Sequence, residues 1–167
     1  MKFGFNGYYW QADVALPAWS DFTAGNTTSL TFAPEGKDEG PMRADEIALT
    51  TWVRDNHEMQ KHLLLNAVLE AYPEFRHQFF EDYNIKENQD DLPMVTSADG
   101  LSKVIALEEI FVHQISKDGL PYVGYQFSCD WDEEHGLGVL MHHKRVIEIG
   151  GADCAFTLWV AERDRDS

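Results

Sequence analysis

The apolar residues change their spacing twice along the chain, and this change sets the strongest limit on the fold. Residues 2–33 are rich in aromatic and β-branched side chains in short runs, which is typical of strands. Between residues 43 and 83 the apolar side chains recur at intervals of three and four, which indicates helix. Residues 101–160 return to alternation with turn signals, which predicts antiparallel hairpins. This order predicts an α+β fold: a mainly antiparallel sheet with a central helical segment packed on one face.

The length of 167 residues suits one core, so we expect a single α+β domain over residues 1–167. Within the helical segment, Asp55 followed by Glu58 has the spacing of a capping box. A first helix should therefore end near Arg54, and a second should begin directly after it. Pro73 lacks the N–H group that continues a helix, which predicts a break there and a third short helix.

The segment 101–115 carries apolar residues on both faces, which predicts a central strand. Simple alternation gives one face Val104, Ala106, Ile110 and Val112, and the opposite face Ile105, Leu107, Phe111 and Ile115. A KDG turn containing Gly119 should join this strand to its partner. A second hairpin should turn at residues 142–144, where the two histidines are expected to be solvated.

Two adjacent glutamates, Glu108 and Glu109, interrupt this central strand. Because neighbouring side chains alternate between faces, one of them must point towards the core or the helices. A carboxylate in that position needs a partner, and Arg145 or Lys103 is expected to supply it.

The charge balance is strongly acidic, with 13 Lys and Arg against 29 Asp and Glu and a net charge of −16. Such a field repels phosphate backbones and anionic lipids, so neither nucleic acid nor a membrane is an expected partner. The charge serves solubility in the simplest interpretation. In the other interpretation it forms an acidic face that docks a basic protein.

The sequence contains no motif of high specificity for a reaction. Neither G-x-S-x-G, nor a Walker A loop, nor G-x-G-x-x-G occurs, and no cofactor is predicted. Cys129 is expected to pack in the core, and nothing nearby in the sequence activates it as a nucleophile with His113 or His135. Two cysteines without a CxxC pair, no run of 18 apolar residues and no signal-peptide pattern predict a cytoplasmic location.

The densest polar and aromatic block lies near the end of the chain. It reads F-S-C-D-W-D-E-E-H-G-L-G-V at residues 127–139, and V-I-E-I-G-G-A-D follows at residues 146–153. These blocks resemble an uncharacterised bacterial family, a domain of unknown function with the signatures F-x-C-x-W-D-x-E-H-G-L-G-V and V-x-x-I-G-G-A-D. The resemblance is strong over residues 122–156. It implies the domain and brings no catalytic residues with it.

The first block has a structural interpretation, in which it bends and seals the sheet. Trp131 would plug the end of a strand, and a neighbouring carboxylate would fix His135. Gly136 and Gly138 would supply positive φ or a close approach of backbones. The candidate binding residues of the block are Asp130, Trp131, Asp132, Glu134 and His135.

The same block has a functional interpretation as a metal or acid–base site. Asp130, Asp132, Glu134 and His135 offer ligands for Ca²⁺, Mg²⁺ or Mn²⁺, or for Zn²⁺ if His142 or His143 joined them. An EF-hand loop is excluded because His135 and Met141 occupy its sixth and twelfth positions.

Two functions therefore follow as hypotheses. One is a non-enzymatic acidic binding module, immunity-like in character, that docks a basic protein. The alternative is a metal-dependent or hydrolase-like enzyme that uses the Asp/Glu/His cluster at residues 130–135.

Overall fold

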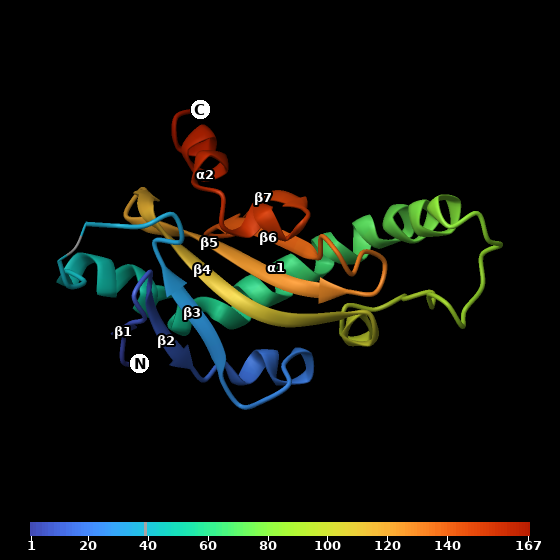
Figure 1. Cartoon of the computed structure of the whole chain (residues 1–167), viewed down its shortest axis with the longest axis horizontal. Coiled ribbons are helices and arrows are strands. Elements are labelled where there is room, and N and C mark those ends of the chain that lie inside the picture. Colours follow the sequence, from blue (N-terminus) through green and yellow to red (C-terminus); the bar gives the residue numbers. More distant parts are fainter. Residues whose placement is uncertain (39) are drawn as a thin grey trace.

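A computed structural model describes residues 1–38 and 40–167, and these residues build one twisted sheet around a long helix (Figure 1). The sheet has seven strands in sequential order. Every neighbouring pair is antiparallel except β3 and β4, which are parallel. The fold is therefore α+β, as the sequence predicts. The strands are β1 (Gly4–Phe5), β2 (Trp10–Val14), β3 (Thr28–Phe32), β4 (Ile105–Lys117), β5 (Leu120–Cys129), β6 (Leu137–His142) and β7 (Arg145–Gly150).

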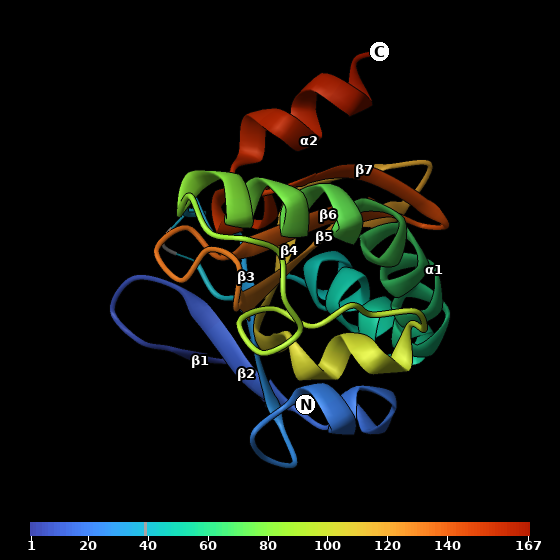
Figure 2. The same ribbon diagram turned by 90° about the vertical axis from the view of Figure 1, so that its right-hand side faces the viewer.

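The connection between β3 and β4 contains the helix α1 (Ala44–Asp82) and the 3₁₀ helix η2 (Asp99–Lys103). The helix α1 packs on one face of the sheet and bends along its length (Figures 1 and 2). The prediction of three helices is wrong. At the expected first break, Asn56 and His57 bond the carbonyls of Trp52 and Arg54 in the preceding turn, so they do not cap a new helix. Pro73 is exposed and lies inside the helix, whose buried face continues past it.

The strand β4 contains a bulge that the sequence does not reveal. Its register against β5 shifts between Leu107 and Glu109. Ile110 therefore points to the same face as Leu107, whereas Glu109 points to the other face. The predicted division of this strand into two alternating faces is wrong from the bulge onwards. The residues of β4 in the main core are Ile105, Leu107, Ile110 and Val112.

The main core lies between the sheet and α1. Trp19, from the short 3₁₀ helix η1 (Pro17–Phe22), is fully buried, and its ring centroid lies 5.5 Å from that of Tyr125. The Tyr125 hydroxyl donates a hydrogen bond of 2.7 Å to Gln60, and the Gln60 amide donates to the carbonyl of His143. Burial raises the pKa of Tyr125 above its usual value. These bonds satisfy both the oxygen and the nitrogen of the Gln60 amide, which α1 brings into the core.

The opposite face of the sheet is covered only in part, by the 3₁₀ helix η3 (Ala152–Ala155) and the helix α2 (Leu158–Arg165). Val160 and Ala161 of α2 form a small second core with Tyr122 and Leu140. The sequence pattern did not predict α2, because hairpins were expected up to residue 160. Over β2 and β3 this face carries no helix in Figure 1, where the strands lie in front of α1.

Both predicted hairpins are confirmed. Asp118 and Gly119, with φ of 55° and 75°, turn β4 into β5, and His143, with φ of 54°, turns β6 into β7. His142 is not solvated as expected: it belongs to β6, is buried, and lies 2.9 Å from the carbonyl of Lys117. Within the described parts of the chain, no helix is both long and apolar enough to cross a membrane.

Candidate functional site

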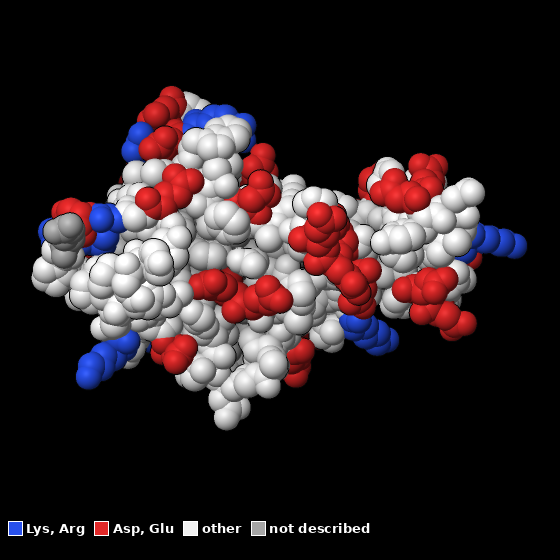
Figure 3. Space-filling model, in the orientation of Figure 1, with Lys and Arg blue, Asp and Glu red and all other residues white. Residues whose placement is uncertain are grey.

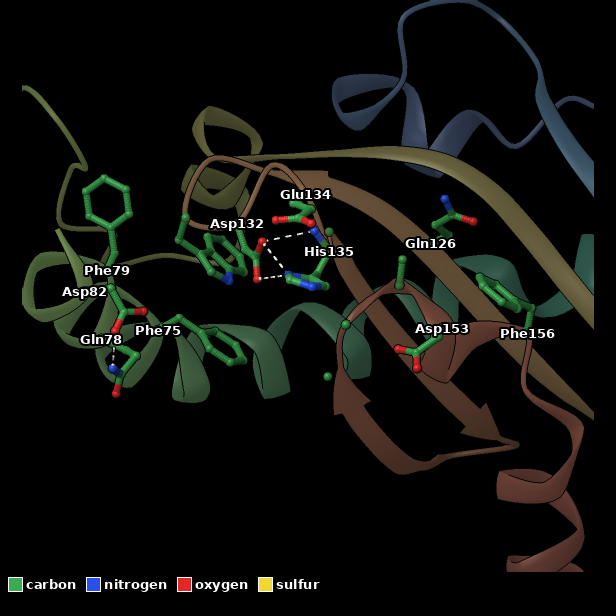
Figure 4. A pocket seen from close by; sticks show the side chains of 15 residues that line it. Phe75, Gln78, Phe79, Asp82, Gln126, Asp132, Glu134, His135, Asp153 and Phe156 are labelled. Atoms are coloured by element: carbon green, nitrogen blue, oxygen red, sulfur yellow. Dashed lines mark hydrogen bonds and ion pairs between the residues drawn. The ribbon is translucent and has the colours of Figure 1, made fainter.

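A groove with a volume of about 810 Å³ lies between the last turns of α1, the loop after β5 and the segment after β7 (Figure 4). Phe75, Gln78, Phe79 and Asp82 form its helical wall, because positions i, i+3, i+4 and i+7 share one helix face. The remaining lining residues are Gln126, Trp131, Asp132, Glu134, His135, Gly136, Gly150, Gly151, Ala152, Asp153 and Phe156.

Trp131 joins the loop after β5 to the helical wall. Its ring stacks on Phe75 with the centroids 5.2 Å apart and the planes 8° from parallel. Tyr72 meets the same ring edge-on at 5.5 Å. The half-buried indole therefore packs against the margin of the main core and also lines the groove, where it fixes the position of the loop that follows it.

Asp132 and His135 form a local hydrogen-bonded pair within this loop. The Asp132 carboxylate accepts the backbone N–H of His135 at 3.0 Å and lies 3.1 Å from its Nδ1 atom. Gly136 follows with φ of 67° and donates its N–H to the Asp132 carbonyl. A side chain at Gly136 would lie 2.9 Å from the carbonyl oxygen of Phe127, so glycine is needed in this tight turn. The predicted fixing of His135 by a neighbouring carboxylate is present.

The third wall of the groove is the segment after β7, and backbone contacts hold it against the loop after β5. Ala152 donates its N–H to the carbonyl of His135 at 2.8 Å. A side chain at Gly138 would lie 2.4 Å from the carbonyl oxygen of Gly151, so this glycine permits the close approach of η3. The two sequence blocks thus lie side by side and together place Asp153 at the groove.

The groove is acidic and aromatic. Its carboxylates are Asp82, Asp132, Glu134 and Asp153, and its aromatic rings belong to Phe75, Phe79, Trp131 and Phe156. No lysine or arginine occurs among the described residues that line it. Figure 3 shows acidic side chains over the middle of the sheet face opposite α1 and also at both ends of the molecule, whereas the basic ones lie towards the periphery. A cation entering the groove would therefore meet only favourable formal charges.

The structure brings four of the five candidate binding residues together at the groove: Trp131, Asp132, Glu134 and His135. Asp130 is exposed and does not line it. Desolvation of its carboxyl group by the surrounding protein atoms, and secondarily the negative charge of Glu133, raise the pKa of Asp130. Across residues 1–38 and 40–167, no three His, Cys, Asp or Glu side chains are arranged to hold a metal ion.

Two cysteines lie near the site, and neither is an activated nucleophile. Burial raises the pKa of both Cys129 and Cys154 to about 11, so both remain protonated thiols at neutral pH. Cys129 is buried in the core, as predicted, and its Sγ donates to the carbonyl of Asp132.

Sequence reasoning missed the helical wall and the far end of the groove. Phe75, Phe79 and Asp82 have a helical spacing that the sequence does show, but nothing in it indicates which loop they face. Asp153 is the last residue of the second signature block, and Phe156 follows it by three positions. Their position at the groove depends on the turn through Gly150 and Gly151.

Comparisons with known proteins place the chain in a family. Neither the curated proteins nor the solved structures give a match. A family profile described as "Domain of unknown function (DUF6985)" matches residues 2–156, which include the whole sheet and every lining residue of the groove. The helix α2 lies beyond the matched range. The resemblance to an uncharacterised domain family is thereby confirmed, and the chain belongs to the DUF6985 family of domains of unknown function.

Proposed function

We propose that this chain is a non-enzymatic acidic binding module that docks a basic protein, and that the groove receives cationic side chains of that protein. One observation carries the proposal: four carboxylates and four aromatic rings line the groove, and no described lining residue is a lysine or an arginine. An immunity-like role, in which the basic partner is a toxin that the module neutralises, is the finer form of this proposal.

The chemistry of the groove suits arginine and lysine side chains. Carboxylates pair with the cationic head group, and aromatic rings accept the guanidinium plane or the apolar stem. The volume of about 810 Å³ leaves room for more than one such side chain. The net charge of −16 adds long-range attraction, which raises the association rate with a basic partner.

A pair of charge-matched variants tests whether binding is local to the groove. Asp132→Asn with Glu134→Gln removes two negative charges from the lining and retains an oxygen that can accept the His135 N–H. The control, Asp21→Asn with Glu70→Gln, removes two charges from exposed positions outside the groove.

The probe is a short oligo-arginine peptide, titrated by calorimetry at low salt. We expect the groove variant to bind about tenfold more weakly than the wild type, and the control to change by less than about threefold. Equal weakening in both variants would mean that the peptide responds only to net charge, and the groove proposal would be rejected.

A second candidate function is hydrolase-like acid–base chemistry, and the contact between Asp132 and His135 favours it. A carboxylate that orients an imidazole is a common arrangement for a general base. This candidate function requires that the wild type hydrolyses a model ester or phosphoester and that His135→Ala loses this activity. Its metal-dependent form further requires Ca²⁺, Mg²⁺, Mn²⁺ or Zn²⁺ to raise the melting temperature.

A further inference from the structure

A second acidic position lies on the open face of the sheet, outside the groove, and is centred on Glu109. Three neighbouring strands present their side chains there, with Gln11 opposite Thr31 and Ser29 opposite Glu109 in the strand register. The bulge in β4 turns Glu109 to this face, away from α1. Residues from distant parts of the sequence thereby form one polar platform, which consists of Gln11, Ser29, Thr31 and Glu109.

The two carboxylate oxygens of Glu109 have different surroundings. Its Oε1 atom accepts hydrogen bonds from Thr31 at 2.5 Å, from Gln11 at 3.2 Å and from Ser29 at 3.4 Å. Its Oε2 atom accepts no hydrogen bond from the described residues and is not among the buried atoms without a partner, so it reaches the surface. The platform thus fixes the carboxylate through one oxygen and leaves the other available.

Neither of the basic side chains expected to pair with this carboxylate does so among the described residues. Arg145 pairs with Asp164 at 2.9 Å, and Lys103 forms no ion pair in the part of the chain that the structure describes. The prediction that Arg145 or Lys103 serves Glu108 or Glu109 is therefore wrong. All three donors to Glu109 are uncharged, so its negative charge is oriented but not neutralised. A half-buried carboxylate held in this way attracts a cation more strongly than a freely rotating one.

The platform adjoins the groove through one residue. Gln126 of β5 is the register partner of Glu109, and it also lines the groove. Figure 4 shows Gln126 and Phe156 at one end of the groove, with Phe79 and Asp82 at the other. A chain that leaves the groove past Gln126 therefore arrives at Glu109 on the neighbouring strand.

We infer that Glu109 is a second cation-binding position of the docking surface, which receives a lysine or arginine side chain from the same basic segment that fills the groove. The class of partner rests on the proposed function, but the residues are different. Charge complementarity identifies the partner as a basic segment. The Oε2 atom of Glu109, the exposed Glu108 and the acidic groove all present negative charge along the path from the groove past Gln126 to Glu109.

The substitution Glu109→Gln tests this inference with minimal disturbance. The glutamine Oε1 atom can retain the three bonds of the platform, while an amide replaces the oxygen that would meet the cation. We expect an unchanged melting temperature and about three- to tenfold weaker binding of the oligo-arginine peptide. The control Glu70→Gln removes the same charge from an exposed position on α1 and should bind within about twofold of the wild type.

Amide chemical shifts of the wild type supply a readout that needs no variant. Adding the peptide should shift the amides of Gln11, Thr31 and Glu109 together with those of the groove. The inference would be overturned if Glu109→Gln bound the peptide as tightly as Glu70→Gln does, or if the chemical-shift changes were confined to the groove. Either result would leave the groove proposal standing. Loss of binding in Glu109→Gln without loss in the groove variant would retain Glu109 and reject the groove.

Discussion

Gly124 decides how closely the C-terminal segment can approach the sheet. A side-chain carbon at this position would lie 1.8 Å from the carbonyl oxygen of Ala155 and 2.5 Å from its carbonyl carbon. The same segment is held by His113, whose Nε2 atom lies 3.0 Å from that oxygen. The missing side chain of Gly124 therefore permits a buried hydrogen bond between β4 and η3.

Replacing Gly124 by alanine should destabilise the protein strongly. The new methyl group must displace backbone atoms of η3, so we expect a loss of about 2–4 kcal/mol in the free energy of unfolding, measured by urea denaturation. Gly25→Ala is the matched control, because nothing lies within 4 Å of a side chain added there. A similar effect of both substitutions would show that η3 does not pack on Gly124.

At this scale, the sequence predicts interactions between near neighbours and fails for distant ones. The pairing of Asp132 with His135 and the turn at Gly136 follow from residues within four positions of one another. The prediction of a cationic partner for Glu109 was wrong because the surroundings of this residue depend on a bulge and on the parallel pairing with β3. His142 was wrongly placed in a solvated turn because the hairpin begins one residue later.

The helix α2 is held by contacts with strands that are distant in sequence. Asp164 accepts hydrogen bonds from the Tyr122 hydroxyl at 2.6 Å and from Arg145 at 2.9 Å and 3.1 Å. The Arg145 guanidinium, followed by the Tyr122 hydroxyl, lowers the pKa of Asp164 from 3.8 to about 2. One carboxylate thus ties α2 to β5 and β7.

We expect Asp164→Asn to loosen α2 and to cost about 1–2 kcal/mol of unfolding free energy at pH 7. Because the folded state lowers this pKa, its stabilising contribution is present above about pH 4 and is lost as the pH falls towards 2. The difference between wild type and variant should therefore shrink over that range in urea titrations at several pH values.

Asp166→Asn is the control for this prediction, because Asp166 is exposed and pairs only with its neighbour Arg165 among the described residues. It should leave stability nearly unchanged, and hydrogen exchange in residues 158–165 should increase only in Asp164→Asn. A difference between wild type and Asp164→Asn that stays constant down to pH 2 would contradict the assignment of the effect to this carboxylate.

Element type was more predictable than element boundaries. The strands and hairpins follow from period and turn chemistry, whereas the break expected at Asp55 does not occur, because α1 has a continuous core to pack against. The helix α2 is only eight residues long, and its apolar contacts are on distant strands, so no local pattern reveals it. The groove shares this property, since it requires α1 and two loops to meet.

Over the whole molecule, the net charge of −16 should give salt two opposite effects. In the free protein the excess of carboxylates repels itself, and this repulsion is partly relieved when the chain expands. Sodium chloride screens the repulsion, so the melting temperature should rise by a few degrees between roughly 0.02 M and 0.5 M salt. In the complex, the same screening weakens attraction to the basic peptide, so affinity should fall by about tenfold or more.

Measuring the salt dependence of both peptide affinity and melting temperature on the same samples separates binding at the groove from the effect of total charge. The groove variant has lost two lining carboxylates, so its residual peptide binding should depend less steeply on salt than that of the charge-matched control. The salt dependence of the melting temperature should be alike in the two variants, because each removes the same total charge. Identical salt slopes for peptide binding would show that attraction is spread over the whole surface, with no preference for the groove.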